Sequence, residues 1–125
     1  MFQLNGKVIT GLGKGRHIGF PTINLHPGCA PATMEHGVYV AKIHTVFGNF
    51  GGVLHYGKRY IHDGKVSLEI YCFGLDKDLY GTSVAVEAIK KLRDVYAFKN
   101  AEELKLQIEK DVAAAKKELN STTLL

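Results

Sequence analysis

The chain has 125 residues, of which 46% are hydrophobic, and a formal net charge of +4. This size and composition suit one globular domain with a single core over residues 1–125, and no apolar run is long enough to cross a bilayer as a helix. The amino terminus lacks the basic and apolar regions of a signal peptide, so we expect a cytoplasmic protein without membrane contact.

Short runs rich in β-branched and aromatic residues occupy the first hundred residues and are separated by glycines. We expect strands at 7–10, 37–46, 51–57, 66–73 and 82–89. Their spacing is that of hairpins, and no helical period lies between them. The pattern therefore predicts an antiparallel sheet or closed barrel rather than a βαβ fold.

The first of these runs leads into a glycine-rich segment, GLGKGRHIG, at 11–19. The segment matches neither the Walker A loop nor the dinucleotide-binding GxGxxG pattern. Glycines nevertheless let backbone N–H groups approach an anion, and basic side chains add further donors. We name as candidate nucleotide-binding residues Gly11, Gly13, Lys14, Gly15, Arg16 and His17. A plain turn between strands is the alternative.

A rigid dipeptide follows the glycines. Pro21 restricts the preceding residue to extended backbone, so a strand is expected to begin at Thr22. In a strand Thr22 and Asn24 point to the same face. Their hydroxyl and amide oxygens suit a Mg²⁺ ion that takes its negative ligands from nucleotide phosphates. The alternative is a local hydrogen-bonding role at a strand end.

The run at 66–73 alternates apolar and mixed positions. One face carries Val66, Leu68, Ile70 and Cys72, and the other carries Ser67, Glu69, Tyr71 and Phe73. Glu69 is a lone carboxylate in the middle of this strand. If its face lines a nucleotide cleft, Glu69 could accept a proton from an attacking hydroxyl. An ordinary exposed carboxylate is the alternative.

One helix is expected after the strands, at about 100–119. Asn100 can cap it, and Glu103 completes a capping-box pattern. An apolar stripe recurs at helical spacing and indicates a core-facing side: Leu104, Ile108, Val112, Ala115 and Leu119.

The cysteines and histidines form no recognisable metal-binding pattern. Cys29 and Cys72 lack a CxxC spacing and are expected to be reduced, buried or half-buried side chains. The positive charge suits an anionic partner, but lysines spread along the chain are equally well explained by solubility.

Taken in order over nearly the whole chain, these motifs resemble the riboflavin kinase (flavokinase) family. The matching segments are GFPTIN at 19–24, GVY at 37–39, LEI at 68–70, DLYG at 78–81, LRD at 92–94 with Phe98, and EELKLQIEKD at 102–111. The resemblance implies a six-stranded antiparallel Greek-key barrel with a C-terminal helix. It implies transfer of the ATP γ-phosphate to the terminal ribityl hydroxyl of riboflavin, giving FMN and ADP.

The same resemblance assigns roles to individual residues. Thr22 and Asn24 would hold the divalent metal together with the nucleotide phosphates, Glu69 would be the catalytic base, and the glycine loop would cover the phosphates. Arg93 lies in a segment similar to the family's flavin-side flap and is a candidate flavin-binding residue. Riboflavin and ATP are thus the expected partners, with Mg²⁺ or another divalent cation, and the chain is expected to be a monomer.

Two departures from the family pattern stand out. Where the family usually reads Asn-Ile-Gly-x-x-Pro-Thr, this chain has HYGKRYI at 55–61, so Gly57 and Arg59 are the residues that correspond. Ile23 replaces the Ala that the family usually has between the two metal ligands. The first departure could alter the pocket wall, the acceptor specificity or a turn. We also expect the adenylyltransferase domain of many bacterial versions to be absent.

Two other classes of function are retained as alternatives. The first is a barrel that binds single-stranded nucleic acid through a platform of aromatic and basic side chains: Phe47, Phe50, Tyr56, Tyr60, Lys58 and Arg59. The second is a flavin- or nucleotide-binding protein that keeps the fold without turnover. The kinase interpretation predicts no nucleic-acid partner.

Overall fold

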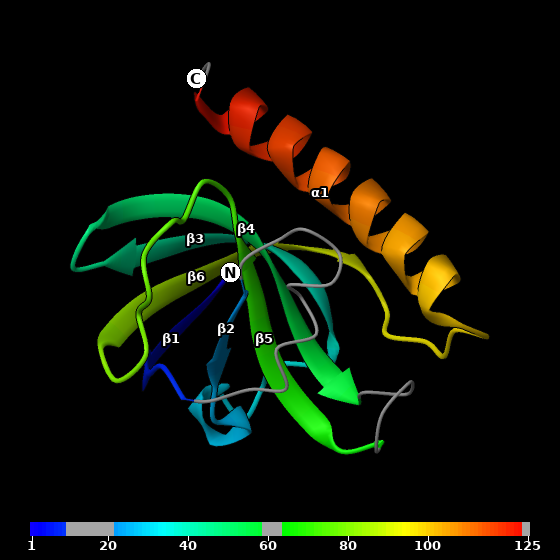
Figure 1. Cartoon of the computed structure of the whole chain (residues 1–125), viewed down its shortest axis with the longest axis horizontal. Coiled ribbons are helices and arrows are strands. Elements are labelled where there is room, and N and C mark those ends of the chain that lie inside the picture. Colours follow the sequence, from blue (N-terminus) through cyan, green and yellow to red (C-terminus); the bar gives the residue numbers. More distant parts are fainter. Residues whose placement is uncertain (10–21, 59–63, 124–125) are drawn as a thin grey trace.

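The computed structural model describes residues 1–9, 22–58 and 64–123, with side chains up to residue 120. Six strands precede one long helix (Figure 1). The elements in chain order are β1 Phe2–Lys7, β2 Thr22–Leu25, the short 3₁₀ helix η2 Pro27–Cys29, β3 Gly37–Thr45, β4 Gly48–Lys58, β5 Val66–Cys72, β6 Ser83–Arg93 and α1 Ala101–Thr123.

The strands form one antiparallel sheet in the order β1-β6-β3-β4-β5-β2. Strands β3, β4 and β5 follow one another as neighbours, and β6 returns to lie beside β3, which is a Greek-key arrangement. The sheet curls until its two edges meet, and there the Ile9 N–H donates to the Asn24 carbonyl at 2.8 Å. The predicted six-stranded Greek-key barrel with a C-terminal helix is confirmed.

The position of the first strand differs from the prediction. Pairing with β6 begins at Phe2, opposite Ala88, and ends at Lys7. Beyond Lys7 the chain leaves β6, because the Val8 N–H donates to the Thr82 carbonyl and Ile9 bonds to β2. The β-branched residues at 8 and 9 therefore carry the chain from one sheet edge to the other.

Two apolar clusters lie on opposite faces of the sheet. The inner cluster fills the barrel and includes Leu4, Ile23, Leu25, Ile43, Leu54, Leu68 and Ile70. The outer cluster joins Val38, Val40, Val53 and Tyr71 to the helix residues Ile108, Val112 and Ala115. Leu104 and Leu119 pack against the outer cluster, so the predicted apolar stripe of the helix is confirmed. In Figure 1 α1 runs along the outside of the barrel.

The start of α1 is capped as its sequence predicts. The Glu103 N–H donates to Asn100 Oδ1 at 2.9 Å, and Glu103 Oε2 accepts from the Lys99 N–H at 3.1 Å. The return bond thus reaches the residue before the cap rather than the cap itself. The helix extends to Thr123, a few residues beyond the predicted end.

The two cysteines are free thiols in packed surroundings. Cys72 is fully buried in the barrel, where burial raises the pKa of its thiol to about 12. Cys29 is half-buried and packs against the same inner cluster. The prediction of small, packed side chains is confirmed.

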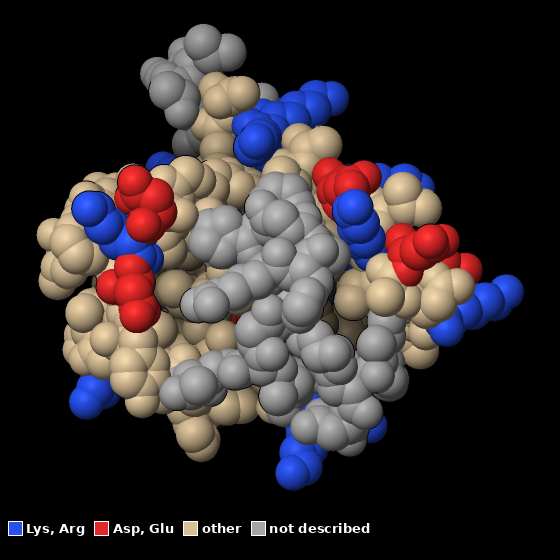
Figure 2. All heavy atoms as spheres, viewed as in Figure 1, with Lys and Arg blue, Asp and Glu red and all other residues tan. Residues whose placement is uncertain are grey.

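Among the described residues, side chains of both charges are interspersed along the margin of the face shown in Figure 2. Within the described residues, no helix has the length and hydrophobicity of a membrane-spanning segment.

Candidate active site

The predicted metal ligands and the predicted base lie side by side. Ile23 and Leu25 of β2 point into the barrel and are buried, so the half-buried Thr22 and Asn24 share the outer face. Asn24 is directly opposite Glu69 of β5. Directly opposite residues on one face of an antiparallel pair have Cβ atoms about 4.5–5.5 Å apart. The register therefore places a neutral oxygen donor next to a half-buried carboxylate.

The row continues across the sheet to a histidine. His55 of β4 is directly opposite Glu69, and Val38 of β3 lies opposite both His55 and Arg93 of β6. Five residues from five strands thus line up on the outer face in the order Asn24, Glu69, His55, Val38 and Arg93. Sequence reasoning noted His55 as part of an atypical segment and assigned it no metal and no role in the site, because its place beside Glu69 depends on strand register.

His55 is a neutral polar group in a desolvated position. Burial, and secondly the positive charge of Arg93, lower the pKa of its imidazole to about 4. Its Nδ1 atom is buried and has no hydrogen-bond partner among the described residues. At neutral pH the ring therefore has one N–H and one acceptor nitrogen.

A small cavity of about 30 Å³ lies between this end of the row and α1. Its walls are mostly apolar and aromatic, with a few polar groups. The lining residues include Val38, His55, Tyr71, Arg93, Tyr96, Phe98, Leu104 and Asp111. Tyr96 and Phe98, from the segment after β6, have ring centroids 4.7 Å apart. Burial raises the pKa of the Tyr71 hydroxyl, so this side chain stays uncharged.

Arg93 joins β6 to the helix. Its Nε and Nη2 atoms donate to the two carboxylate oxygens of Asp111 at 2.9 and 2.8 Å, and Gln107 Nε2 donates to the same carboxylate at 3.0 Å. The guanidinium also lies over the rings of Tyr96 and Phe98, at 5.0 and 5.8 Å from their centroids. Arg93 thus orders the aromatic segment as well as the helix, and its predicted contact with a flavin stays a prediction.

The glycine loop falls outside the described residues. Gly11, Gly13, Lys14, Gly15, Arg16 and His17 therefore remain predictions, as do Arg59 and Tyr60 of the atypical segment. Gly57 of that segment is described: its φ is +154°, and a Cβ atom there would lie 2.9 Å from Val95 Cγ2. The correspondence at Gly57 thus has a structural reason, since the segment at 94–98 packs directly on its backbone.

The aromatic platform proposed for nucleic acid is not assembled by the described residues. Phe50 and Tyr56 pack against the inner cluster, and the Tyr56 ring also contacts His36 at 4.7 Å between centroids. Phe47 is 53% exposed at the turn between β3 and β4. These three rings do not share one exposed face, which weighs against the nucleic-acid interpretation.

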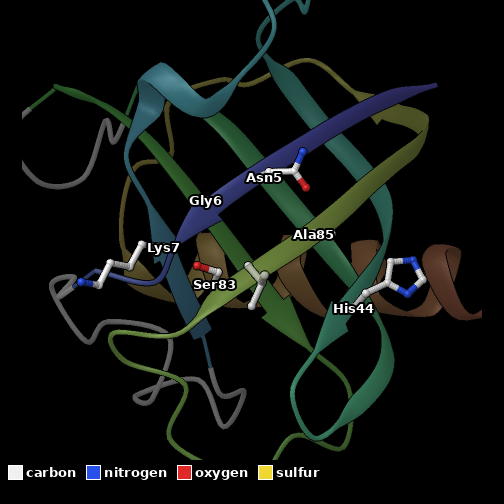
Figure 3. A pocket seen from close by; sticks show the side chains of 7 residues that line it. Asn5, Gly6, Lys7, His44, Ser83 and Ala85 are labelled. Carbon is white, nitrogen blue, oxygen red and sulfur yellow. The ribbon is translucent and has the colours of Figure 1, made fainter.

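A second hollow lies on the opposite part of the sheet and is shallow. Figure 3 shows Asn5 on β1 and His44 on β3, on either side of Ser83 and Ala85 of β6. His44 is paired there: its ring nitrogens lie 2.8 Å from Glu87 Oε2 and 2.9 Å from Asn49 Oδ1. The hollow contains none of the predicted site residues.

Comparison with known proteins agrees with this geometry. The statistical description of the Flavokinase (riboflavin kinase) family matches residues 1–119. A bifunctional riboflavin kinase/FMN adenylyltransferase from Haemophilus influenzae is 40% identical over 124 residues, covering 96% of this chain and 39% of that protein. A solved structure described as a macrolide-efflux protein from Streptococcus pneumoniae has a TM-score of 0.78 at 28% identity, covering 91% of this chain and 38% of that one.

A riboflavin kinase from Trypanosoma brucei has a TM-score of 0.64 at 20% identity, covering 95% of this chain and 80% of that chain. That likeness supports the fold. The family match, by contrast, spans residues 1–119 of this chain. The chain spans 39% of the length of the Haemophilus relative. The chain belongs to the riboflavin kinase (flavokinase) family.

Proposed function

We propose that this chain is a riboflavin kinase, which transfers the γ-phosphate of ATP to the terminal ribityl hydroxyl of riboflavin and releases FMN and ADP. The observation that carries the proposal is the pairing of Asn24 with Glu69 across β2 and β5. It brings a candidate metal ligand next to a candidate base, immediately after the glycine loop in sequence. Family membership supports the same reaction.

Thr22 and Asn24 would hold the metal. Both donors are neutral oxygens on one face of a short strand, which suits Mg²⁺ because this ion retains waters and takes negative ligands from phosphates. The strand is held on both sides, by β5 and by the Ile9 bridge. When bound, the ion would neutralise charge that develops on the transferred phosphoryl group. The glycine loop would supply backbone donors to the phosphates.

Glu69 would act as the base. Its carboxylate is half-buried on the same face as Asn24, so an acceptor hydroxyl at this position would lie between the base and the metal-bound nucleotide. A placed base accepts the hydroxyl proton as the oxygen attacks phosphorus. The proton moves to a Glu69 oxygen. The bond between the γ-phosphorus and the bridging oxygen breaks, and ADP leaves with the electron pair of that bond.

The flavin ring would lie on the Arg93 side of the row. Tyr96 and Phe98 provide aromatic surface there, but a cavity of about 30 Å³ is far smaller than an isoalloxazine ring. Typical ligand pockets have about 300–1,000 Å³. Binding would therefore require the segment at 94–98 to move away from α1. Monomeric state and action in the cytoplasm stay predictions.

One assay tests the reaction. Purified chain is incubated with riboflavin, ATP and Mg²⁺, and the flavins are separated; FMN should accumulate in proportion to protein concentration. The Glu69→Gln variant keeps the shape of the side chain but loses the base, so its turnover should fall by about 10²–10⁴-fold. Tight flavin or ATP binding without FMN would favour the non-catalytic alternative. Salt-sensitive retention of single-stranded RNA without FMN would favour the nucleic-acid alternative.

A further inference from the structure

We propose that His55 is a positioning residue for the acceptor: its Nδ1 atom hydrogen-bonds an internal hydroxyl of the polyol chain whose terminal hydroxyl lies at Glu69. The inference rests on the proposed kinase function and adds a residue to it. Neither the candidate metal ligands nor the candidate base accounts for how a flexible polyol is held in line for attack.

Strand register supplies the first step of the argument. His55 is directly opposite Glu69 on the neighbouring strand, and adjacent strands lie about 4.8 Å apart. A ribityl chain that leaves Glu69 toward the aromatic residues Tyr96 and Phe98 must pass His55. The next residue along the row is Val38, which offers no hydrogen bond. His55 is therefore the first polar side chain of the row that such a chain meets.

The state of the imidazole supplies the second step. Nδ1 is buried without a partner among the described residues, and leaving a buried polar atom unpaired destabilises a protein. Binding of a ligand that hydrogen-bonds to this atom would remove that cost. A hydroxyl both donates and accepts, so it pairs with Nδ1 in either neutral tautomer. Because His55 lines the cavity beside Arg93 and Tyr71, a polyol that enters this cavity would supply the hydrogen-bond partner that Nδ1 lacks among the described residues.

The test compares two acceptors that differ only in the proposed contact. Riboflavin has three internal side-chain hydroxyls, whereas its hydroxypentyl analogue keeps the ring and the terminal hydroxyl but lacks all three. For His55→Leu, kcat/KM for riboflavin should fall about tenfold, the effect of one lost hydrogen bond, while kcat/KM for the analogue should change less than about twofold. His55→Asn retains a hydrogen-bonding group near the Nδ1 position and should recover most of the loss.

Matched variants keep the test decisive. His44→Leu makes the same substitution on the other half of the barrel and should affect both acceptors equally. Should His55→Leu fail to fold by circular dichroism, His55→Phe retains a planar ring without nitrogen atoms and carries the same expectation. Equal losses with the two acceptors, or no loss with riboflavin, would overturn the proposal.

The failure of this inference is distinguishable from failure of the kinase function. If the parent protein makes no FMN, the proposed function is wrong, and the inference is then judged by binding alone. Titrations that follow flavin fluorescence should show the parent preferring riboflavin to the hydroxypentyl analogue and His55→Leu losing that preference. Equal preference in the two proteins would overturn the role of His55.

Discussion

Arg93 and Asp111 form a buried ion pair whose loss should destabilise the fold strongly. The Arg93→Met substitution keeps the apolar stem and removes the two hydrogen bonds at 2.9 and 2.8 Å. The Asp111 side chain is only 5% exposed, so its charge would keep Gln107 as a partner but lose its cation. Breaking a buried pair in this way costs about 3–5 kcal/mol, a large share of the roughly 5–15 kcal/mol that stabilises a typical domain.

Urea denaturation followed by far-ultraviolet circular dichroism measures this loss. The control is Lys90→Met, since Lys90 and Glu118 also join β6 to α1 but lie 3.6 Å apart with side chains 60% and 37% exposed. An exposed pair contributes at most about 1 kcal/mol, so the control should unfold close to the parent midpoint. Comparing the two variants separates burial of the pair from attachment of the helix.

A double variant tests the cause of the destabilisation. Arg93→Met with Asp111→Leu replaces both charges by apolar groups and removes the uncompensated carboxylate. It should therefore be more stable than Arg93→Met alone, because replacing a whole buried pair is often nearly neutral. If Arg93→Met costs less than about 1 kcal/mol, or if the two substitutions simply add, the reasoning from an uncompensated buried charge is refuted.

Three further predictions follow from the described contacts. Asn24→Ala should raise the Mg²⁺ concentration needed for half-maximal FMN formation while leaving the urea midpoint unchanged; an unaltered Mg²⁺ dependence would rule out this ligand. The hydrogen bond to Glu87 raises the pKa of His44. The stabilisation by this hydrogen bond should therefore be full below pH 6.5 and be lost as pH rises through the pKa of His44 in the folded protein. The stabilities of the parent and His44→Gln should converge at alkaline pH, and a difference that is the same at every pH would contradict this. Ile108→Ala should lower the free energy of unfolding by about 2–5 kcal/mol. Leu106→Ala, at an exposed position of the same helix, should lower it by less than about 0.5 kcal/mol. Similar losses in the two variants would show that the outer cluster does not hold the helix.

Periodicity separated the two faces of β5 and predicted the inward face of α1, because both depend on local spacing alone. The strand alternation at 66–73 placed Glu69 on the face opposite Leu68 and Ile70, which fill the barrel. The helical stripe through Ile108 identified the side that packs on the sheet. The first strand was placed too late because Val8 and Ile9 have strong β propensity, whereas the pairing with β6 is made by the residues before them.

Contacts between distant strands could not be read from the sequence. The alignment of Asn24, Glu69 and His55 needs the register of three strands, which local patterns do not determine. The pairing of Arg93 with Asp111 likewise depends on how α1 crosses the end of β6. The roles of Thr22, Asn24 and Glu69 stay predictions. They could be named because the family resemblance assigns them, whereas spacing alone left a local structural role equally open.

The order in which the strands pair also affects how the protein folds during its synthesis. Phe2 pairs with Ala88, so β1, the first of these six strands to be synthesised, lacks its partner until the other strands have followed. At about 5–20 residues per second, the wait is roughly 4–17 s. During that time Phe2 and Leu4 have no barrel to enter, while β3, β4 and β5 can already pair as successive hairpins. Vectorial synthesis should thus build the wall that carries Glu69 and His55 first and complete the barrel last.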